Sequence, residues 1–218
     1  MNKKKLAALL ISGALAIGIV GGSLAWFTST DSVENEFTTG TTEDNKPDAG
    51  IKIDETFDKD AAKKIVPGTE INKDVAVKST ANYAQFIRAK LTLKIKDENG
   101  NYVEKKLTDN YTDGVTYGDL INLKYFEDEN GNLGEDGKWI QDGDYFYYMA
   151  AVPGAGTTSK LLDSVTLNTK ADNTWKNKEF EVVVDALGVQ ASNDAVADVF
   201  KEASADTINT LKSLQVSN

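Results

Sequence analysis

The sequence predicts an all-β protein, a jelly-roll-like antiparallel β-sandwich with short helices near the C-terminus. Apolar and polar residues alternate in short runs from residue 51 to residue 189, as they do in strands with one buried face. Turn-forming residues separate these runs at short spacing. Nine or ten strands spaced in this way are typical of a two-layer sandwich or jelly roll. A helical period replaces the alternation only near the C-terminus.

The clearest strand covers residues 87–95, where every second residue is apolar and the residues between are basic or polar. One buried face and one wet face indicate an antiparallel sheet. The Asn-Gly pair within residues 97–101 predicts a tight hairpin into the next strand. The other expected strands cover residues 51–53, 71–77 after a turn at 66–68, 102–107, 123–126, 138–141, 145–152, 161–167 and 180–189.

Two segments of this pattern are less regular. Residues 108–121 are expected to form a loop with a helical turn around residues 117–121. The aromatic residues 145–148 alternate along a strand, so half of them should enter the core and half should lie on the sheet surface. They could form a platform for sugars, but cross-strand packing is the favoured interpretation.

The C-terminal region changes to a helical period. Ala195, Val196, Val199, Phe200 and Ala203 share one helical face, and Asn193 or Asp194 is placed as the N-cap. A second amphipathic stretch covers residues 206–214. We expect these helices to cover one end or edge of the sandwich.

Composition excludes several kinds of chemistry. The chain has no histidine and no cysteine, so it can form neither a nucleophilic His-containing triad nor a His- or Cys-ligated zinc site. A glycosidase-like pair of carboxylates stays possible, although nothing singles one out. The net charge of −10 argues against nucleic-acid binding. The sequence therefore predicts no catalytic residue, no metal ligand and no cofactor.

The N-terminus predicts secretion. Three lysines precede an apolar run from Leu6 to Val20, and Ser23 and Ala25 occupy the small positions of a signal-peptidase site. The expected domains are a signal peptide at 1–25, a donor strand and connector at 26–50, and the sandwich at 51–218. A membrane anchor over residues 6–25 is the alternative, but glycines interrupt the run and no basic cluster follows it.

Cleavage after Ala25 would create a new terminus that begins with an aromatic pair, Trp26 and Phe27. Phe27, Val33 and Phe37 share one parity, so an extended strand would present all three to one side. Such a segment gains backbone hydrogen bonds and buries its aromatic rings only when it pairs at a sheet edge. We therefore expect a segment that joins one copy of the chain to another.

One pattern suggests a metal site. Asp128, Asn130 and Asn132 have the first, third and fifth spacing of a calcium loop, but Leu133 replaces the required glycine and Trp139 replaces the bidentate glutamate. The same D-E-N-G-N string occurs at residues 97–101, where it fits a hairpin turn. Turn formation is the favoured interpretation at both places.

Several segments resemble a known family. The junction LAWFTSTDSVENEFTTG is similar to that of SipW-dependent secreted proteins, and VPGTEINKDVAVKSTANYAQFIRAKL (66–91) resembles a strand pair of the same group, as do residues 139–167 and 181–196. The chain is thus similar to BsaA-type biofilm matrix proteins of the TasA and camelysin family. The resemblance implies a jelly-roll domain that polymerises into extracellular fibres by donor-strand exchange. Camelysin-like proteins are described as metalloproteases, and the absence of histidine argues against that activity here.

Together these features predict a secreted structural subunit of biofilm matrix fibres, located in the extracellular matrix or on the cell surface. The expected partners are a second copy in a head-to-tail homopolymer and a signal peptidase of the SipW type, with paralogous matrix subunits as further candidates. No nucleic acid is expected as a partner, and no membrane after cleavage. The first alternative is a monomeric surface adhesin or a module that binds carbohydrate or a host protein. The second is an enzyme that uses two carboxylates.

Overall fold

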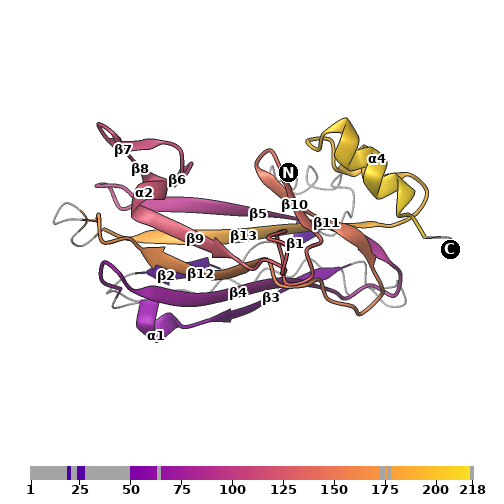
Figure 1. Ribbon diagram of the computed structural model, residues 1–218, viewed down its shortest axis with the longest axis horizontal. Coiled ribbons are helices and arrows are strands. Elements are labelled where there is room, and N and C mark those ends of the chain that lie inside the picture. The colour runs from indigo at the N-terminus through magenta and orange to yellow at the C-terminus, as the bar shows by residue number, and fades with distance from the viewer. Residues whose placement is uncertain are drawn as a thin grey trace, which may run out of the picture.

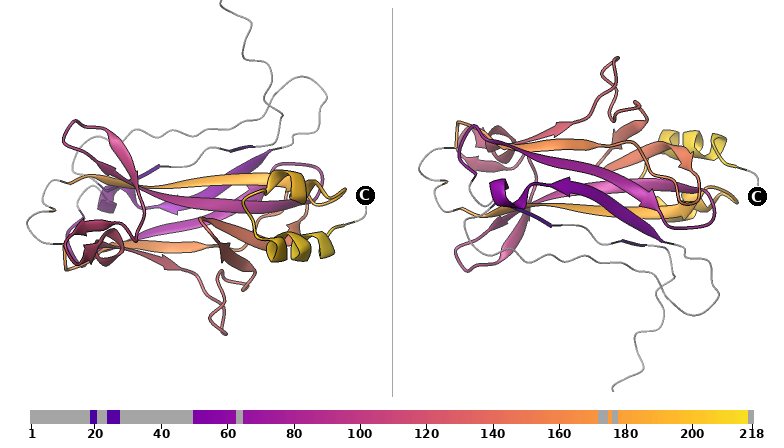
Figure 2. Two further views of the ribbon diagram at one scale, coloured as in Figure 1. Left: turned by 90° about the horizontal axis from the view of Figure 1, so that it is seen from above. Right: turned by 90° about the horizontal axis from the view of Figure 1, so that it is seen from below.

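The computed structural model describes residues 19–20, 24–27, 50–62, 65–171, 175 and 178–216. They form two antiparallel sheets stacked face to face, so the predicted all-β sandwich is confirmed (Figures 1 and 2). The first sheet contains β1 (Ile19–Val20), β2 (Leu24–Phe27), β13 (Phe180–Gln190), β5 (Gln85–Lys96), β6 (Tyr102–Lys105), β11 (Tyr145–Val152) and β10 (Trp139–Asp142). The second contains β3 (Ile51–Phe57), β4 (Glu70–Ser79), β12 (Leu162–Leu167) and β9 (Ile121–Tyr125).

Smaller elements cover the ends of the sandwich. A hairpin of β7 (Asn110–Thr112) and β8 (Val115–Thr116) leads into α2 (Tyr117–Leu120), which confirms the helical turn expected there. The other helices are α1 (Lys59–Ala62), α3 (Ala195–Val199) and α4 (Ala205–Ser213). The projection that carries β6, β7 and β8 lies at the opposite end of the molecule from α4 (Figure 1).

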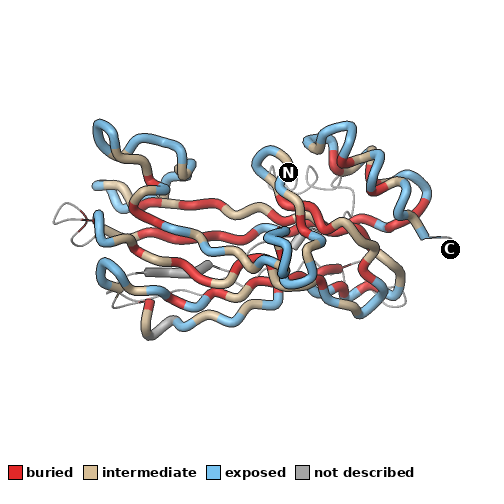
Figure 3. Tube along the Cα trace, in the orientation of Figure 1, coloured by how far each residue is buried: buried red, intermediate tan, exposed pale blue. Residues whose placement is uncertain are grey.

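The main core lies between the two sheets. Ile87, Ala89, Leu93 and Ile95 of β5 are buried there, as their alternation predicts. Figure 3 shows buried positions along the middle of the strands and exposed positions on the connecting loops. The two sheets approach closely where β13 faces β3, and this contact depends on Gly188 of β13. A Cβ at Gly188 would lie 2.7 Å from Cγ2 of Ile51 on β3.

A second apolar cluster lies on the outer face of the first sheet, under α3 and α4. Tyr147 and Phe86 pack there against Val196, Phe200 and Leu211. The helices therefore cover one end of the sandwich, as expected. The predicted alternation of residues 145–148 is confirmed, since Phe146 and Tyr148 enter the main core and Tyr145 and Tyr147 lie on the outer face of the sheet. That outer face is not a free surface, because the helices cover it at Tyr147.

The predicted N-cap position is confirmed at Asp194, but this residue does not cap in the usual way. Asp194 precedes α3 but has a left-handed backbone and makes no side-chain cap hydrogen bond. Its carboxylate instead accepts a hydrogen bond from Nε2 of Gln215 at 2.8 Å, and this bond ties the start of α3 to the segment after α4. The helix ends at Val199, yet Phe200 stays fully buried.

Candidate functional site

The candidate site is the outer edge of β13. On its inner side, β13 pairs with β5 along its whole length, from Phe180 opposite Ile95 to Gln190 opposite Gln85. On its outer side, the partners are the two short strands β1 and β2. A long strand with partial cover offers unpaired backbone groups that another strand can join.

The expected cleavage point lies within β2. Ala25 and Trp26 are opposite Val182 and Glu181, and Phe27 is opposite Phe180. The two residues of β1 pair further along the same edge of β13. Cleavage after Ala25 would remove β1 and half of β2 while keeping Trp26 and Phe27, and so would open most of this edge. The other predicted donor residues, Val33 and Phe37, lie outside the described residues.

Glu181 is an unusual residue at this edge, and sequence reasoning missed it. It pairs with Lys94 of β5 on one side and with Trp26 of β2 on the other, and it is only 2 % exposed. Burial raises the pKa of Glu181 to about 7, although the charges of Lys94 and Lys96 oppose this shift. The available signal was a carboxylate between Phe180 and the apolar run Val182–Val184 in a predicted strand.

Replacing Glu181 with Gln should stabilise the protein at neutral to alkaline pH. Because the native pKa exceeds the unfolded value, Glu181 destabilises the fold increasingly as pH rises from about 4.5 to about 7. The gain for Glu181→Gln should be on the order of 1–3 kcal/mol at pH 8 and near zero at pH 4. Urea denaturation at both pH values measures it, with Asp185→Asn at an exposed position of β13 as the control. Equal effects at both pH values would contradict the assignment.

The two D-E-N-G-N segments form matching turns. Oδ1 of Asp97 accepts hydrogen bonds from the N–H groups of Asn99 and Asn101 at 2.9 and 2.8 Å. Oδ1 of Asp128 accepts those of the corresponding residues in the second segment at the same distances. These hydrogen bonds confirm turn formation at both places. The side-chain amide of Asn132 and the backbone N–H groups hold the pKa of Asp128 below its usual range, and the backbone N–H groups of its own turn do so for Asp97.

We expect metal chelators to leave the melting temperature unchanged. The carboxylate of Asp128 already accepts two backbone N–H groups and the Asn132 amide, so it is committed to the turn. Thermal unfolding with and without EDTA is the measurement. A fall of several degrees in EDTA would instead identify Asp128, Asn130 and Asn132 as calcium ligands.

The aromatic residues 145–148 do not form an exposed platform. Phe146 and Tyr148 enter the main core, while Tyr147 is buried under the C-terminal helices. The half-buried Tyr145 lies against the guanidinium of Arg88, 4.3 Å from the ring centroid. These contacts support packing, which the sequence favoured, over recognition of sugars.

Comparison with known proteins identifies a family. A family model described as camelysin metallo-endopeptidase matches residues 1–132, which is more than half of the chain. The chain belongs to this family. No curated protein and no solved structure matches it. Membership supports a protein of the biofilm-matrix type in general, while the narrower BsaA-type assignment stays a prediction.

The family description implies a metal ion. The residues of this chain do not fit the catalytic zinc site that is usual in peptidases. Catalytic zinc sites in peptidases draw on histidine, and the chain has none. Across the described ranges, no group of three or more acidic residues gathers closely enough to hold a metal ion. We therefore derive no catalytic step through a metal.

Proposed function

We propose that this chain is a secreted structural subunit of extracellular biofilm matrix fibres and has no enzymatic activity. Its N-terminal segment, freed by a signal peptidase of the SipW type, would pair with another copy by donor-strand exchange. The observation that carries the proposal is the placement of β2, which spans the expected cleavage point, on the open edge of β13. Family membership is consistent with this role.

The physical argument starts from the edge. After cleavage, Trp26 and Phe27 would be the only described residues left on the outer side of β13, opposite Glu181 and Phe180. An added strand from a neighbouring copy would restore the missing ladder of backbone hydrogen bonds. Because the donor and acceptor are different surfaces, the contact is heterologous, and repeated contacts generate a filament unless they close into a ring.

A membrane anchor is the alternative fate of the N-terminal apolar run. In the part of the chain that the structure describes, no helix is long and apolar enough to cross a membrane. Most of residues 6–25, the alternative anchor, lie outside that part. We include secretion to the extracellular matrix or cell surface in the proposal, on the basis of the signal-peptide pattern at residues 1–25.

Assembly tests the proposed function directly. A chain that starts at Trp26 should form filaments under the electron microscope and leave the monomer position in size-exclusion chromatography. A stable monomer would contradict the fibre role and favour the adhesin. Release of peptides from casein, or of sugars from a glycan panel, would contradict the absence of activity.

We expect secreted material to begin at Trp26. Ser23 and Ala25 provide the small residues that a signal peptidase reads, and cleavage there leaves the aromatic pair at the new terminus. Intact mass or N-terminal sequencing of the secreted protein is the measurement. A mature terminus beyond Phe27 would remove the aromatic pair and contradict the proposed trigger for assembly.

A further inference from the structure

The ladder of the first sheet is interrupted on the side of β5 that faces away from β13. There, β11 places Phe146 opposite Ala89, and β6 places Lys105 opposite Leu93. Neither register reaches Leu91, which lies between them. The interruption is therefore centred on Leu91.

Backbone geometry shows which groups face this gap. The N–H of Lys96 donates to the carbonyl of Glu179, on the β13 side of β5. Because successive residues of a strand direct their backbone groups to opposite sides, Leu91 directs its N–H and C=O away from β13 and into the gap. Within the described strands, neither β11 nor β6 provides a ladder partner for these two groups.

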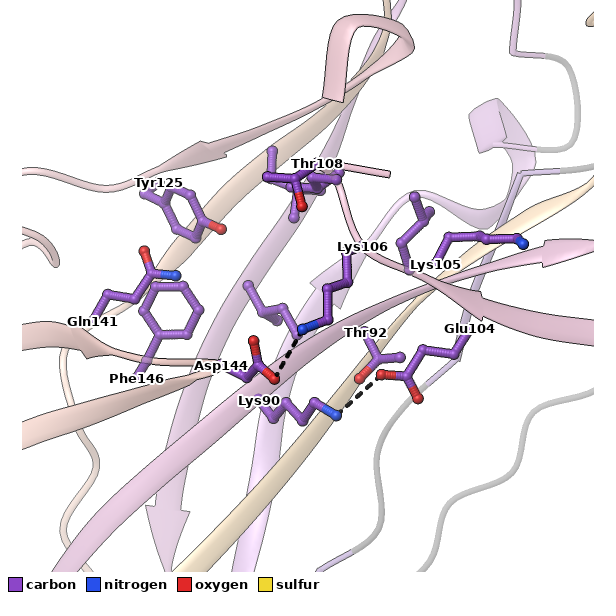
Figure 4. Close-up of a pocket in the computed structure, with 14 residues that line it drawn as sticks. Lys90, Thr92, Glu104, Lys105, Lys106, Thr108, Tyr125, Gln141, Asp144 and Phe146 are labelled. Carbon is purple, nitrogen blue, oxygen red and sulfur yellow. Dashed lines mark hydrogen bonds and ion pairs between the residues drawn. The ribbon is translucent and has the colours of Figure 1, made fainter. Parts of the chain in front are cut away.

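A pocket of about 200 Å³ opens at the same place (Figure 4). Its inner wall is apolar and contains Leu91, Leu123, Tyr125 and Phe146. The rings of Tyr125 and Phe146 lie 5.3 Å apart between their centroids. Burial raises the pKa of Tyr125 to about 12.

Charged side chains surround the mouth. Two ion pairs cross it, Lys90 with Glu104 at 3.1 Å and Lys106 with Asp144 at 3.7 Å (Figure 4). The side chains of Lys106 and Asp144 are 65 % and 61 % exposed, so opening this pair costs little. With Lys105 included, the lining residues carry three positive and two negative charges, in a chain that is acidic overall.

The volume of the pocket and the backbone groups of Leu91 define the kind of ligand that it can bind. An apolar cavity of about 150 Å³ is large enough to bind benzene, so this pocket can accept one aromatic side chain. A residue of an extended peptide placed opposite Leu91 would form hydrogen bonds with the N–H and C=O of Leu91. The side chain of that residue would lie on the same face of the sheet as the side chain of Leu91. That face is the apolar interior of the pocket.

We propose that this pocket accepts Phe37 from a second copy of the chain. Trp26 and Phe27 belong to β2, and Phe37 is the one aromatic residue in the sequence from 28 to 49. Three acidic residues accompany it within 28–40, and that stretch contains no basic residue. This charge complements the lysines at the mouth.

A second copy, rather than the same chain, fits the arrangement of strands. β2 lies beyond β13, whereas the pocket lies on the opposite side of β5. A donor at one side and an acceptor at the other give the head-to-tail contact that a filament needs. The inference rests on the proposed polymerisation and adds to the edge of β13 a second acceptor position, which takes the side chain of Phe37.

A synthetic peptide of residues 33–40 tests the pocket without requiring polymerisation. It is added to the chain starting at Trp26 with Phe37→Ala, and nuclear magnetic resonance follows the Leu91 amide and the Tyr125 ring. We expect saturable shifts at both. The Phe37→Ala peptide should bind at least about tenfold more weakly, because it loses a buried aromatic ring. If neither the Leu91 amide nor the Tyr125 ring shifts on addition of the peptide, the proposal is overturned.

Two chain variants test the mouth and the interior. Leu123→Trp should fill the pocket and abolish peptide binding. Lys106→Glu should weaken it, most strongly at low salt, whereas Lys201→Glu makes the same charge change at an exposed position outside the pocket lining. Circular dichroism establishes that each variant is folded. If Leu123→Trp is unfolded, the difference between Lys106→Glu and Lys201→Glu decides, and equal binding by those two would overturn the proposal.

Mixing two chains shows whether the contact is intermolecular. The Phe37→Ala chain can accept but not donate, and the Leu123→Trp chain can donate but not accept. Each should stay monomeric alone, and together they should form a 1:1 dimer by size-exclusion chromatography with light scattering. No dimer, despite peptide binding, would mean that Phe37 cannot reach the pocket of a second copy and would overturn the second-copy assignment. If the unmodified chain starting at Trp26 forms no filaments, the proposed function fails separately.

Discussion

A chain starting at Trp26 with Phe27→Ser and Phe37→Ser should stay folded and form no fibres. Each phenylalanine buried at a joint contributes about 1.5–3 kcal/mol. Losing both should weaken each joint by roughly 3–6 kcal/mol, or two to four decades in affinity. A filament repeats this loss at every junction, so long fibres should disappear before the monomer is affected.

The monomer should survive because its core lies elsewhere. The buried residues of β5 pack between the two sheets, and β5 and β13 pair with each other over eleven residue pairs. Electron microscopy measures the fibres, and circular dichroism measures the fold. A chain that starts at Gly40 lacks the whole donor segment and should behave in the same way.

A matched control comes from the same segment. Ser32 has the opposite parity to Phe27 and Phe37, and Ser32→Ala removes no aromatic ring, so fibres should form normally. Loss of fibres in this control as well would mean that the segment does not act through its aromatic side chains.

Two further outcomes would change the account of this segment. Normal fibres from the chain that starts at Gly40 would eliminate donor-strand exchange. Unfolded protein would mean that Trp26 and Phe27, which pair with Glu181 and Phe180, complete their own subunit instead.

Local sequence patterns predicted much of the sandwich because they depend on neighbouring residues. Alternation placed β5 and its buried face correctly, and the repeated D-E-N-G-N strings gave the two Asp-centred turns. The failures involve contacts between distant segments. The sequence around Tyr147 does not predict that helices from residues 195–213 cover it. The sequence around Asp194 does not predict its hydrogen bond with Gln215.

The candidate site was predictable only in part for the same reason. The aromatic pair at 26–27 is visible in the sequence, but its pairing with β13 is a long-range contact. The gap at Leu91 depends on where two other strands begin and end, β11 at Tyr145 and β6 at Lys105. A strand pattern alone predicts an unbroken ladder there.

Lys73 shows how a visible pattern can be overlooked. It has the same parity as Ile71 and Val75 in β4, and it is as fully buried as they are. Its Nζ lies 2.8 Å from Oε2 of Glu55 on the neighbouring strand β3 and 5.3 Å from the centroid of the Phe57 ring. Burial lowers the pKa of Lys73, and the charge of Glu55 opposes this shift.

Replacing Glu55 with Gln should destabilise the protein by about 3–5 kcal/mol, because the buried ammonium of Lys73 would lose its negative partner. Urea denaturation at neutral pH measures the free energy of unfolding. Glu104→Gln is the matched control, since Glu104 pairs with Lys90 on the surface with 57 % of its side chain exposed. That substitution should cost less than about 1 kcal/mol.

The double variant Glu55→Leu and Lys73→Met separates the ion pair from packing. Removing both charges also removes the cost of burying them, so most of the stability lost in Glu55→Gln should return. If the double variant is as unstable as Glu55→Gln, the loss comes from the shape of the site rather than from an unpaired charge. Because β3 and β4 belong to the sheet that does not contain β13, fibre formation by the double variant should be unchanged, which places this ion pair in the fold and not in assembly.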